Sequence, residues 1–183
     1  LIEDQATQHI YVLDAQFNFS GVLVYEPETA SVRQLASPTV GTGPLLISPR
    51  QLLLESNRLL ILETLTARVL SLDVNTGERD IFASEEVGEG EPLSGVTRFT
   101  LDKSRNILYL LDSVRGRILQ LELESGLRSE ILSANSGSAW QDIQYDPESD
   151  RLLILDRSGS RIYAYDLTGQ VLSSLSGGGV GRG

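Results

Sequence analysis

Four acidic residues recur along the chain at nearly even spacing, and their carboxylates are groups that could bind a metal ion. Each one closes a short apolar run, and successive members are separated by 49, 49 and 44 residues. The four are Asp14, Glu63, Asp112 and Asp156. If a repeating fold places them on one rim, their oxygens could surround a hard divalent cation such as calcium. The pattern predicts a candidate cation site, and it indicates no other cofactor.

The same acids have a second interpretation, as devices that close hairpins. Three of them precede an arginine by five residues, which gives the pairs Glu63 and Arg68, Asp112 and Arg117, and Asp156 and Arg161. Acid and base would then flank a four-residue loop and pair across two antiparallel strands. Asp14 is the exception, because its loop carries two extra residues and no arginine. Exposed pairs of this kind are common and weak, so this interpretation makes the acids structural.

Trp140 stands at the entry to the last repeat and is the one tryptophan of the chain. Its indole could line a ligand pocket with the N–H pointing inward, or it could fill the space between neighbouring repeats. Arg50, Arg98 and Asp142 lie beside it in the repeat frame and could point towards a central channel. These four residues are the candidate ligand-binding set.

The composition excludes several kinds of chemistry. Without cysteine there is no disulfide scaffold, thiolate metal site or cysteine nucleophile. The single histidine, His9, would need a serine and an acid from elsewhere to serve as a catalytic base. The net charge of −10 disfavours nucleic acid and anionic membranes as partners. Since no apolar stretch reaches membrane-spanning length, no membrane span is predicted.

Internal repeats indicate which elements position these residues. Each period contains four short runs rich in Val, Ile, Leu and Tyr, bounded by turn residues and without helical periodicity. Four antiparallel strands in a period of this length are typical of a β-propeller blade. We predict an all-β propeller fold with at least about fourteen strands and no helix longer than about two turns. Its four blades are expected at about 1–37, 38–84, 85–133 and 134–176.

The segments between and beyond these blades predict a larger ring. Connectors with glycine and proline lie at 41–44 and 88–92, and 177–183 is expected to be a further glycine-rich connector or tail. Because the chain lacks methionine and residues 1–4 match only the end of a strand, we expect an excerpt of a larger ring. The missing blades would belong to the same protein or to a partner chain, since an open arc exposes apolar sheet faces. A closed four-bladed ring is the alternative. The residues expected on the exposed faces are Ile10, Val12, Leu152 and Ile154.

Three short motifs resemble bacterial NHL-like propeller proteins. They are Gly43-Pro-Leu-Leu-Ile-Ser-Pro-Arg50, Asn57-Arg-Leu-Leu-Ile-Leu62 and Leu72-Asp-Val-Asn-Thr-Gly-Glu-Arg79. The resemblance implies a six-bladed ring that is exported, to the periplasm or outside the cell, and that commonly has no known activity. The gluconolactonase-like family is similar in blade architecture, which implies an enzymatic alternative. Lactonases of that family hold a divalent metal partly through asparagines at blade entries, and the entries at 48–50, 94–96 and 139–141 supply none.

The sequence therefore predicts a non-catalytic binding or scaffold module. Propellers present loops on a rigid frame, and a protein, peptide or saccharide could be recognised there. The alternative is a metal-dependent, lactonase-type hydrolase whose ligands lie partly on absent blades. Three or more oxygens converging on one point would favour the enzyme, whereas apolar packing or paired Arg and Asp would favour the scaffold.

Overall fold

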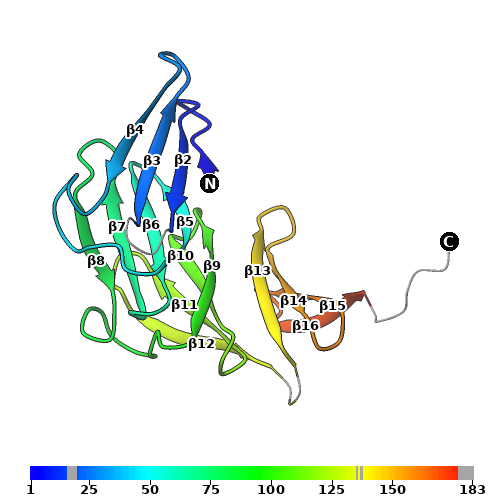
Figure 1. The fold of residues 1–183 in the computed structure, drawn as a ribbon. Coiled ribbons are helices and arrows are strands. Elements are labelled where there is room, and N and C mark those ends of the chain that lie inside the picture. The colour runs from blue at the N-terminus through cyan, green and yellow to red at the C-terminus, as the bar shows by residue number, and fades with distance from the viewer. Residues whose placement is uncertain (16–19, 135, 137, 177–183) are drawn as a thin grey trace. The chain divides into compact units, whose positions relative to one another are not determined.

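The computed structural model describes residues 1–15, 20–134, 136 and 138–176. Within these residues it contains sixteen β-strands and no helix, grouped into four antiparallel four-stranded sheets (Figure 1). In every sheet the strands follow one another in chain order. The predicted all-β fold of propeller-blade type is therefore confirmed. The glycine-rich segment 177–183 lies outside the described residues.

The chain divides into two compact units, and the first, Leu1–Gly88, contains two sheets that we call blades 1 and 2. Blade 1 consists of β1 (Ile2–Glu3), β2 (Ile10–Asp14), β3 (Gly21–Glu26) and β4 (Ser31–Ala36). Blade 2 consists of β5 (Pro49–Glu55), β6 (Arg58–Glu63), β7 (Arg68–Asp73) and β8 (Arg79–Ala83).

The second unit, Glu89–Gly183, contains blades 3 and 4. Blade 3 consists of β9 (Val96–Asp102), β10 (Ile107–Asp112), β11 (Arg117–Glu122) and β12 (Arg128–Ser133). Blade 4 consists of β13 (Trp140–Asp146), β14 (Arg151–Asp156), β15 (Arg161–Asp166) and β16 (Val171–Ser176). Short turns join the strands, so pairing is local and the register follows from each hairpin.

Blades 1 and 2 pack face to face through an apolar seam. β5 lies against β1 and β2, and the alternating side chains of both sheets meet there. The buried residues of this seam are Tyr11, Val22, Val24, Leu35 and Ala36 from blade 1, Leu46 before blade 2, and Leu52, Leu54, Leu59, Ile61, Leu70 and Leu72 from blade 2. Removal of this apolar area from water is what holds the first unit together.

Blades 3 and 4 pack in the same way, but their seam contains aromatic residues. β13 lies against β9 and β10. The buried residues are Tyr109, Leu111 and Ile118 from blade 3, and Trp140, Ile143, Tyr145, Leu152, Ile154 and Tyr165 from blade 4. The rings of Tyr109 and Tyr145 lie 6.0 Å apart at a tilt of 41°. The hydroxyl of a buried tyrosine and the N–H of a buried tryptophan need hydrogen-bond partners, whereas a leucine side chain has no polar group.

The predicted exposure of blade 4 is wrong by one strand position. Leu152 and Ile154 are both fully buried in the seam with blade 3, whereas Leu155 is 43% exposed and Ile162 is 42% exposed. Neighbouring side chains of a strand point to opposite faces, and all positions from 152 to 155 are apolar, so the pattern could not mark the covered face. On blade 1, Ile10 and Val12 are partly exposed.

Two buried arginines attach the connectors to the outer strands of blades 2 and 3. Arg79, 2% exposed, donates from Nε to the Pro44 carbonyl (2.8 Å) and from Nη1 to the Val40 carbonyl (3.0 Å). Arg128 donates from Nε to the Glu91 carbonyl (2.7 Å). Glycine is required opposite each, because a Cβ on Gly43 would lie 1.9 Å from the Arg79 carbonyl oxygen. The predicted connectors are thus held against the blade that follows them.

Candidate functional site

The hairpin between the second and third strands lies at the same end of a blade as its incoming connector, and we call this end the clamp end. Glu63 occupies it in blade 2 and is fully buried. Its carboxylate accepts hydrogen bonds from Arg68 Nε (2.6 Å), the Thr66 hydroxyl (2.8 Å) and the Ile47 amide (2.5 Å). Arg68 also donates to the Leu45 carbonyl (2.7 Å). One buried ion pair therefore ties the hairpin to the connector.

Asp112 makes the equivalent clamp in blade 3. It is fully buried and accepts from Arg117 Nε (3.1 Å), Arg115 Nη1 (2.9 Å) and the Arg115 amide (2.9 Å). Burial raises its pKa, but the hydrogen bonds from Arg115 and Arg117 outweigh burial, so the pKa lies below its ordinary value. Arg115 also donates to the Ser94 carbonyl, which again attaches the connector.

The third predicted pair does not form. Asp156 and Arg161 are register partners, but Arg161 donates to the Tyr163 hydroxyl (3.5 Å) instead. Asp156 accepts from the Ala139 amide (3.0 Å) and from the Ser158 amide (2.9 Å) and hydroxyl (2.7 Å). The hairpin interpretation is thus correct for Glu63 and Asp112. For Asp156 it is wrong, because this carboxylate accepts hydrogen bonds from Ser158 and from the Ala139 amide instead.

No ring of metal ligands emerges from these acids. Asp14 is the register partner of Gly21 and is partly buried, while the other three carboxylates accept hydrogen bonds at their own clamp ends. Among the described residues, no group of three or more His, Asp or Glu side chains is arranged to hold a metal ion. Binding of calcium by the four acids stays a prediction.

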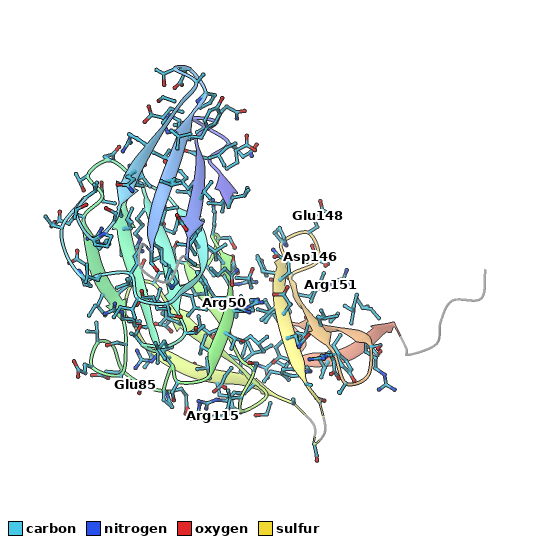
Figure 2. All side chains as sticks on the ribbon, viewed as in Figure 1. Arg50, Glu85, Arg115, Asp146, Glu148 and Arg151 are labelled. Atoms are coloured by element: carbon cyan, nitrogen blue, oxygen red, sulfur yellow. The ribbon has the colours of Figure 1, made fainter. Side chains whose placement is uncertain are left out.

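The members of the candidate ligand-binding set have different surroundings. Arg98 and Asp142 form an ion pair at 3.6 Å, whereas Trp140 is 2% exposed and is part of the seam between blades 3 and 4. The indole N–H is sealed without a hydrogen-bond partner in the part of the chain described, so it presents no donor to solvent. Arg50 is exposed on β5 in the other unit (Figure 2). Trp140 is therefore a packing residue, the second of its two predicted roles.

Exposed apolar side chains at the clamp ends were not predicted from the sequence. In blade 2, Leu45 and Ile47 on the connector are each 53% exposed, and Leu65 in the hairpin loop is 76% exposed. In blade 3, Val114 takes the place of Leu65 and is 77% exposed. Leu65 and Val114 each follow the acid of their clamp by two residues. An apolar residue in an otherwise polar loop was the signal by which the sequence could have revealed them. The clamp ends thus present leucine, isoleucine and valine to solvent on braced loops.

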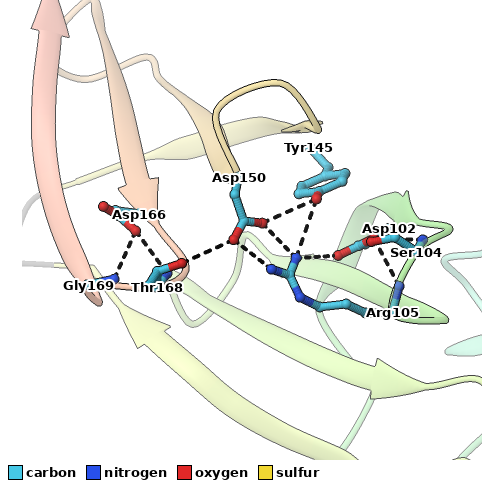
Figure 3. Close-up of polar contacts among 8 residues, drawn as sticks. All are labelled: Asp102, Ser104, Arg105, Tyr145, Asp150, Asp166, Thr168 and Gly169. Atoms are coloured by element: carbon cyan, nitrogen blue, oxygen red, sulfur yellow. Dashed lines mark hydrogen bonds and ion pairs between the residues drawn. The ribbon is translucent and has the colours of Figure 1, made fainter.

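A polar network that we call the latch joins blades 3 and 4 (Figure 3). Arg105 donates to Asp102 (2.6 Å) and, through both Nη atoms, to Asp150 (2.6 Å each). The Tyr145 hydroxyl (3.2 Å) and the Thr168 hydroxyl (3.2 Å) also donate to Asp150. The Arg105 guanidinium lowers the pKa of Asp150, and burial raises the pKa of Tyr145. Sequence reasoning missed the latch because Arg105 and Asp150 are 45 residues apart.

Comparison with known proteins identifies the fold and no family. No protein-family model matches the chain, and no curated protein is significantly similar to it. Among 444 matching solved chains is one from the crystal structure of a nidogen/laminin complex, with a TM-score of 0.66 and 15% sequence identity. The alignment covers 94% of this chain and 60% of that chain, so this chain spans less than two thirds of its length. At this identity the similarity shows the fold alone, which is the β-propeller class.

The described residues include no helix of the length and apolarity that crossing a membrane requires.

Proposed function

We propose that the protein is a non-catalytic binding module that recognises a partner protein through its clamp ends. The observation that carries the proposal is the group formed by Leu45, Ile47 and Leu65 around the Glu63–Arg68 pair. Apolar side chains that gather at one place on a surface mark an interaction site, whereas single exposed ones do not. Apolar anchors on a preorganised frame bind with little loss of conformational entropy.

The remaining features support a protein partner over the other ligands. The charge of −10 disfavours nucleic acid. The solved structure that this fold resembles is described as a complex, which fits a module for protein binding. Export to the periplasm or outside the cell and an NHL-type, six-bladed ring belong to the proposal as well, on the resemblance of the repeat motifs. No observation favours the lactonase-type hydrolase, because the clamp acids form hydrogen bonds within their blades.

The outer face of blade 4 supports a further blade in the complete assembly. In blade 3, Leu111 and Ile118 are fully buried because blade 4 covers them. Their repeat equivalents in blade 4 are Leu155 and Ile162, both more than 40% exposed. We propose that another sheet of the same kind covers this face. Leu155→Glu should then destabilise the complete assembly strongly, and an unchanged melting temperature would show that the face is free.

Site-directed photo-crosslinking tests the binding function. A photoreactive phenylalanine at position 65 should capture a protein in the source organism, and Leu65→Asp should abolish its co-purification. The control is the same photoreactive residue at Val32, which is 63% exposed on β4. Identical products from both positions, or an unaffected Leu65→Asp complex, would refute binding at the clamp end.

A further inference from the structure

The seam between blades 3 and 4 contains a cavity of about 200 Å³ next to the latch. Arg105 of the latch lines one side of it. The other lining residues are Ile107, Tyr109, Gln120 and Ile131 from blade 3, and Tyr165, Leu167 and Gln170 from blade 4. A dry apolar cavity of about 150 Å³ is known to bind benzene, so this space is large enough for a six-membered ring with one polar substituent.

Two polar groups of blade 3 are unused by the protein in this cavity. Tyr109 is 2% exposed, and none of the hydrogen bonds among the described residues involves its hydroxyl or the Gln120 carboxamide. Among the residues that the structure describes, the sealed side-chain atoms without partners are Arg117 Nη2 and Trp140 Nε1. The Tyr109 hydroxyl is not one of them, so it opens to the cavity. By contrast, the Tyr165 hydroxyl donates to the Ile131 carbonyl (3.1 Å). A buried polar group without a partner costs stability unless something else satisfies it.

The repeat keeps a tyrosine at this position but does not require the Gln120 carboxamide. Tyr11 and Val24 are paired across β2 and β3 as Tyr109 and Gln120 are paired across β10 and β11. Val24 is fully buried in the apolar seam of the first unit. The polar carboxamide is therefore a property of this seam and not of the blade fold.

The surroundings favour an uncharged ligand. Burial raises the pKa of Tyr109 to about 12, so its hydroxyl is a neutral donor at physiological pH. Arg105 pairs with both Asp102 and Asp150, so each charged group of the latch already has an ion-pair partner, and the three groups together carry a net charge of −1 that disfavours an anion. Burying an ion there would cost more than burying a neutral amide.

We propose that this cavity binds a small uncharged molecule with a six-membered ring and a carboxamide, whose carbonyl accepts from Tyr109 and whose amide meets Gln120. Apolar contacts from Ile131 and Leu167 would hold the ring. The cavity is not part of the clamp ends, so this proposal does not depend on the proposed protein binding.

Benzamide, benzoate and benzamidinium form a matched set of probes for this site. They share one ring and differ in charge, so titration of the labelled protein by NMR isolates the preference for a neutral group. We expect benzamide to shift the Gln120 side-chain amide and the Tyr109 ring signals saturably, with the two ions binding at least about tenfold more weakly. The proposal is overturned if either ion binds as tightly as benzamide, or if no shift occurs up to about 10 mM.

Two variants locate the binding in the cavity. Tyr109→Phe removes one neutral hydrogen bond and should weaken benzamide about fivefold. Gln120→Val copies the residue of the other seam and should remove the specificity for the carboxamide. Tyr11→Phe, the equivalent change in the first unit, should leave binding unchanged, and spectral dispersion confirms that each variant is folded. Unaltered benzamide binding by both Tyr109→Phe and Gln120→Val would contradict the assignment.

Discussion

The two seams of this protein solve the same packing problem with different chemistry. In the first unit Leu54 and Leu72 of blade 2 face Tyr11 and Val24 of blade 1. In the second unit the positions of Leu54 and Leu72 are taken by Tyr145 and Tyr165, and a charged latch stands beside them. The first seam is held by burial of apolar surface, whereas the second also depends on charge and on hydrogen bonds. The blade fold tolerates both because it fixes where side chains meet and leaves their chemistry open.

Truncation of the apolar seam should have the largest effect. Leu72 is fully buried, so Leu72→Ala removes buried methyl groups and leaves a cavity at a cost of about 3 kcal/mol. Urea unfolding measures this loss, and it should change little with salt. Val32→Ala, at a site 63% exposed, is the control and should change stability by less than about 0.5 kcal/mol. A loss below about 1 kcal/mol for Leu72→Ala would mean that apolar packing does not dominate this seam.

Removal of the latch should have a smaller effect that depends on salt. Arg105→Met leaves the fully buried Asp102 and the partly buried Asp150 without their common cation. Because Arg105 is 42% exposed, solvent screens its charge, and the loss is smaller than for a fully buried ion pair. We expect the free energy of unfolding to fall by about 2 kcal/mol. Thr7→Val changes the repeat-equivalent position of blade 1, where Thr7 donates to the Asp4 carboxylate (2.8 Å), and should cost less than about 1 kcal/mol. Equal losses for both variants would show that the latch adds nothing to the second seam.

Acid should weaken the second seam through the carboxylates of the latch. The hydrogen bonds from Arg105 lower the pKa of Asp150; for Asp102, burial raises the pKa but hydrogen bonds from Ser104 and Arg105 outweigh it. Because both pKa values are lower in the folded state, their stabilisation is complete above the unfolded value near 3.8 and is lost as the pH falls through the folded values.

The fluorescence of Trp140 reports this loss selectively, since the one tryptophan lies in the second seam. Its emission should shift to the red on acidification below about pH 4, and Asp150→Asn should reduce the pH dependence. An Asp150→Asn protein with the wild-type acid transition would exclude Asp150 as its cause.

Relief of backbone strain should have the smallest effect and should not distinguish the units. Ala30 in the first unit has φ of 52°, and Gln170 in the second has φ of 53°, both in the left-handed region. Ala30→Gly and Gln170→Gly should each stabilise the protein by about 0.5 kcal/mol in thermal or urea unfolding. Gly77→Ala is the opposite control and should destabilise the protein, because the added Cβ would lie 2.1 Å from the Leu35 carbonyl oxygen. A stabilisation confined to one unit would mean that the turns differ in more than their sequence.

Local features of the site were predictable from the sequence because they need only one hairpin. Glu63 with Arg68 and Asp112 with Arg117 flank four-residue loops, so strand pairing alone brings them together. Asp156 with Arg161 shows the limit of the same rule, since the loop between them offers Ser158 as a competing donor. Register determined that these two residues are opposite each other, and side-chain competition determined that they do not bond.

The sequence by itself determined four blades of four strands, because period-two alternation and turn residues act within a few positions. Only the tertiary structure decided which face of each blade is covered, since Leu152 through Leu155 are all apolar and adjacent residues point to opposite faces. It also decided the latch and the cavity beside it, because sheet packing joins Arg105 to Asp150 and Tyr109 to Tyr165 across distant parts of the chain. Hairpin chemistry is local and can be predicted from sequence, whereas the chemistry between blades depends on how two sheets pack together.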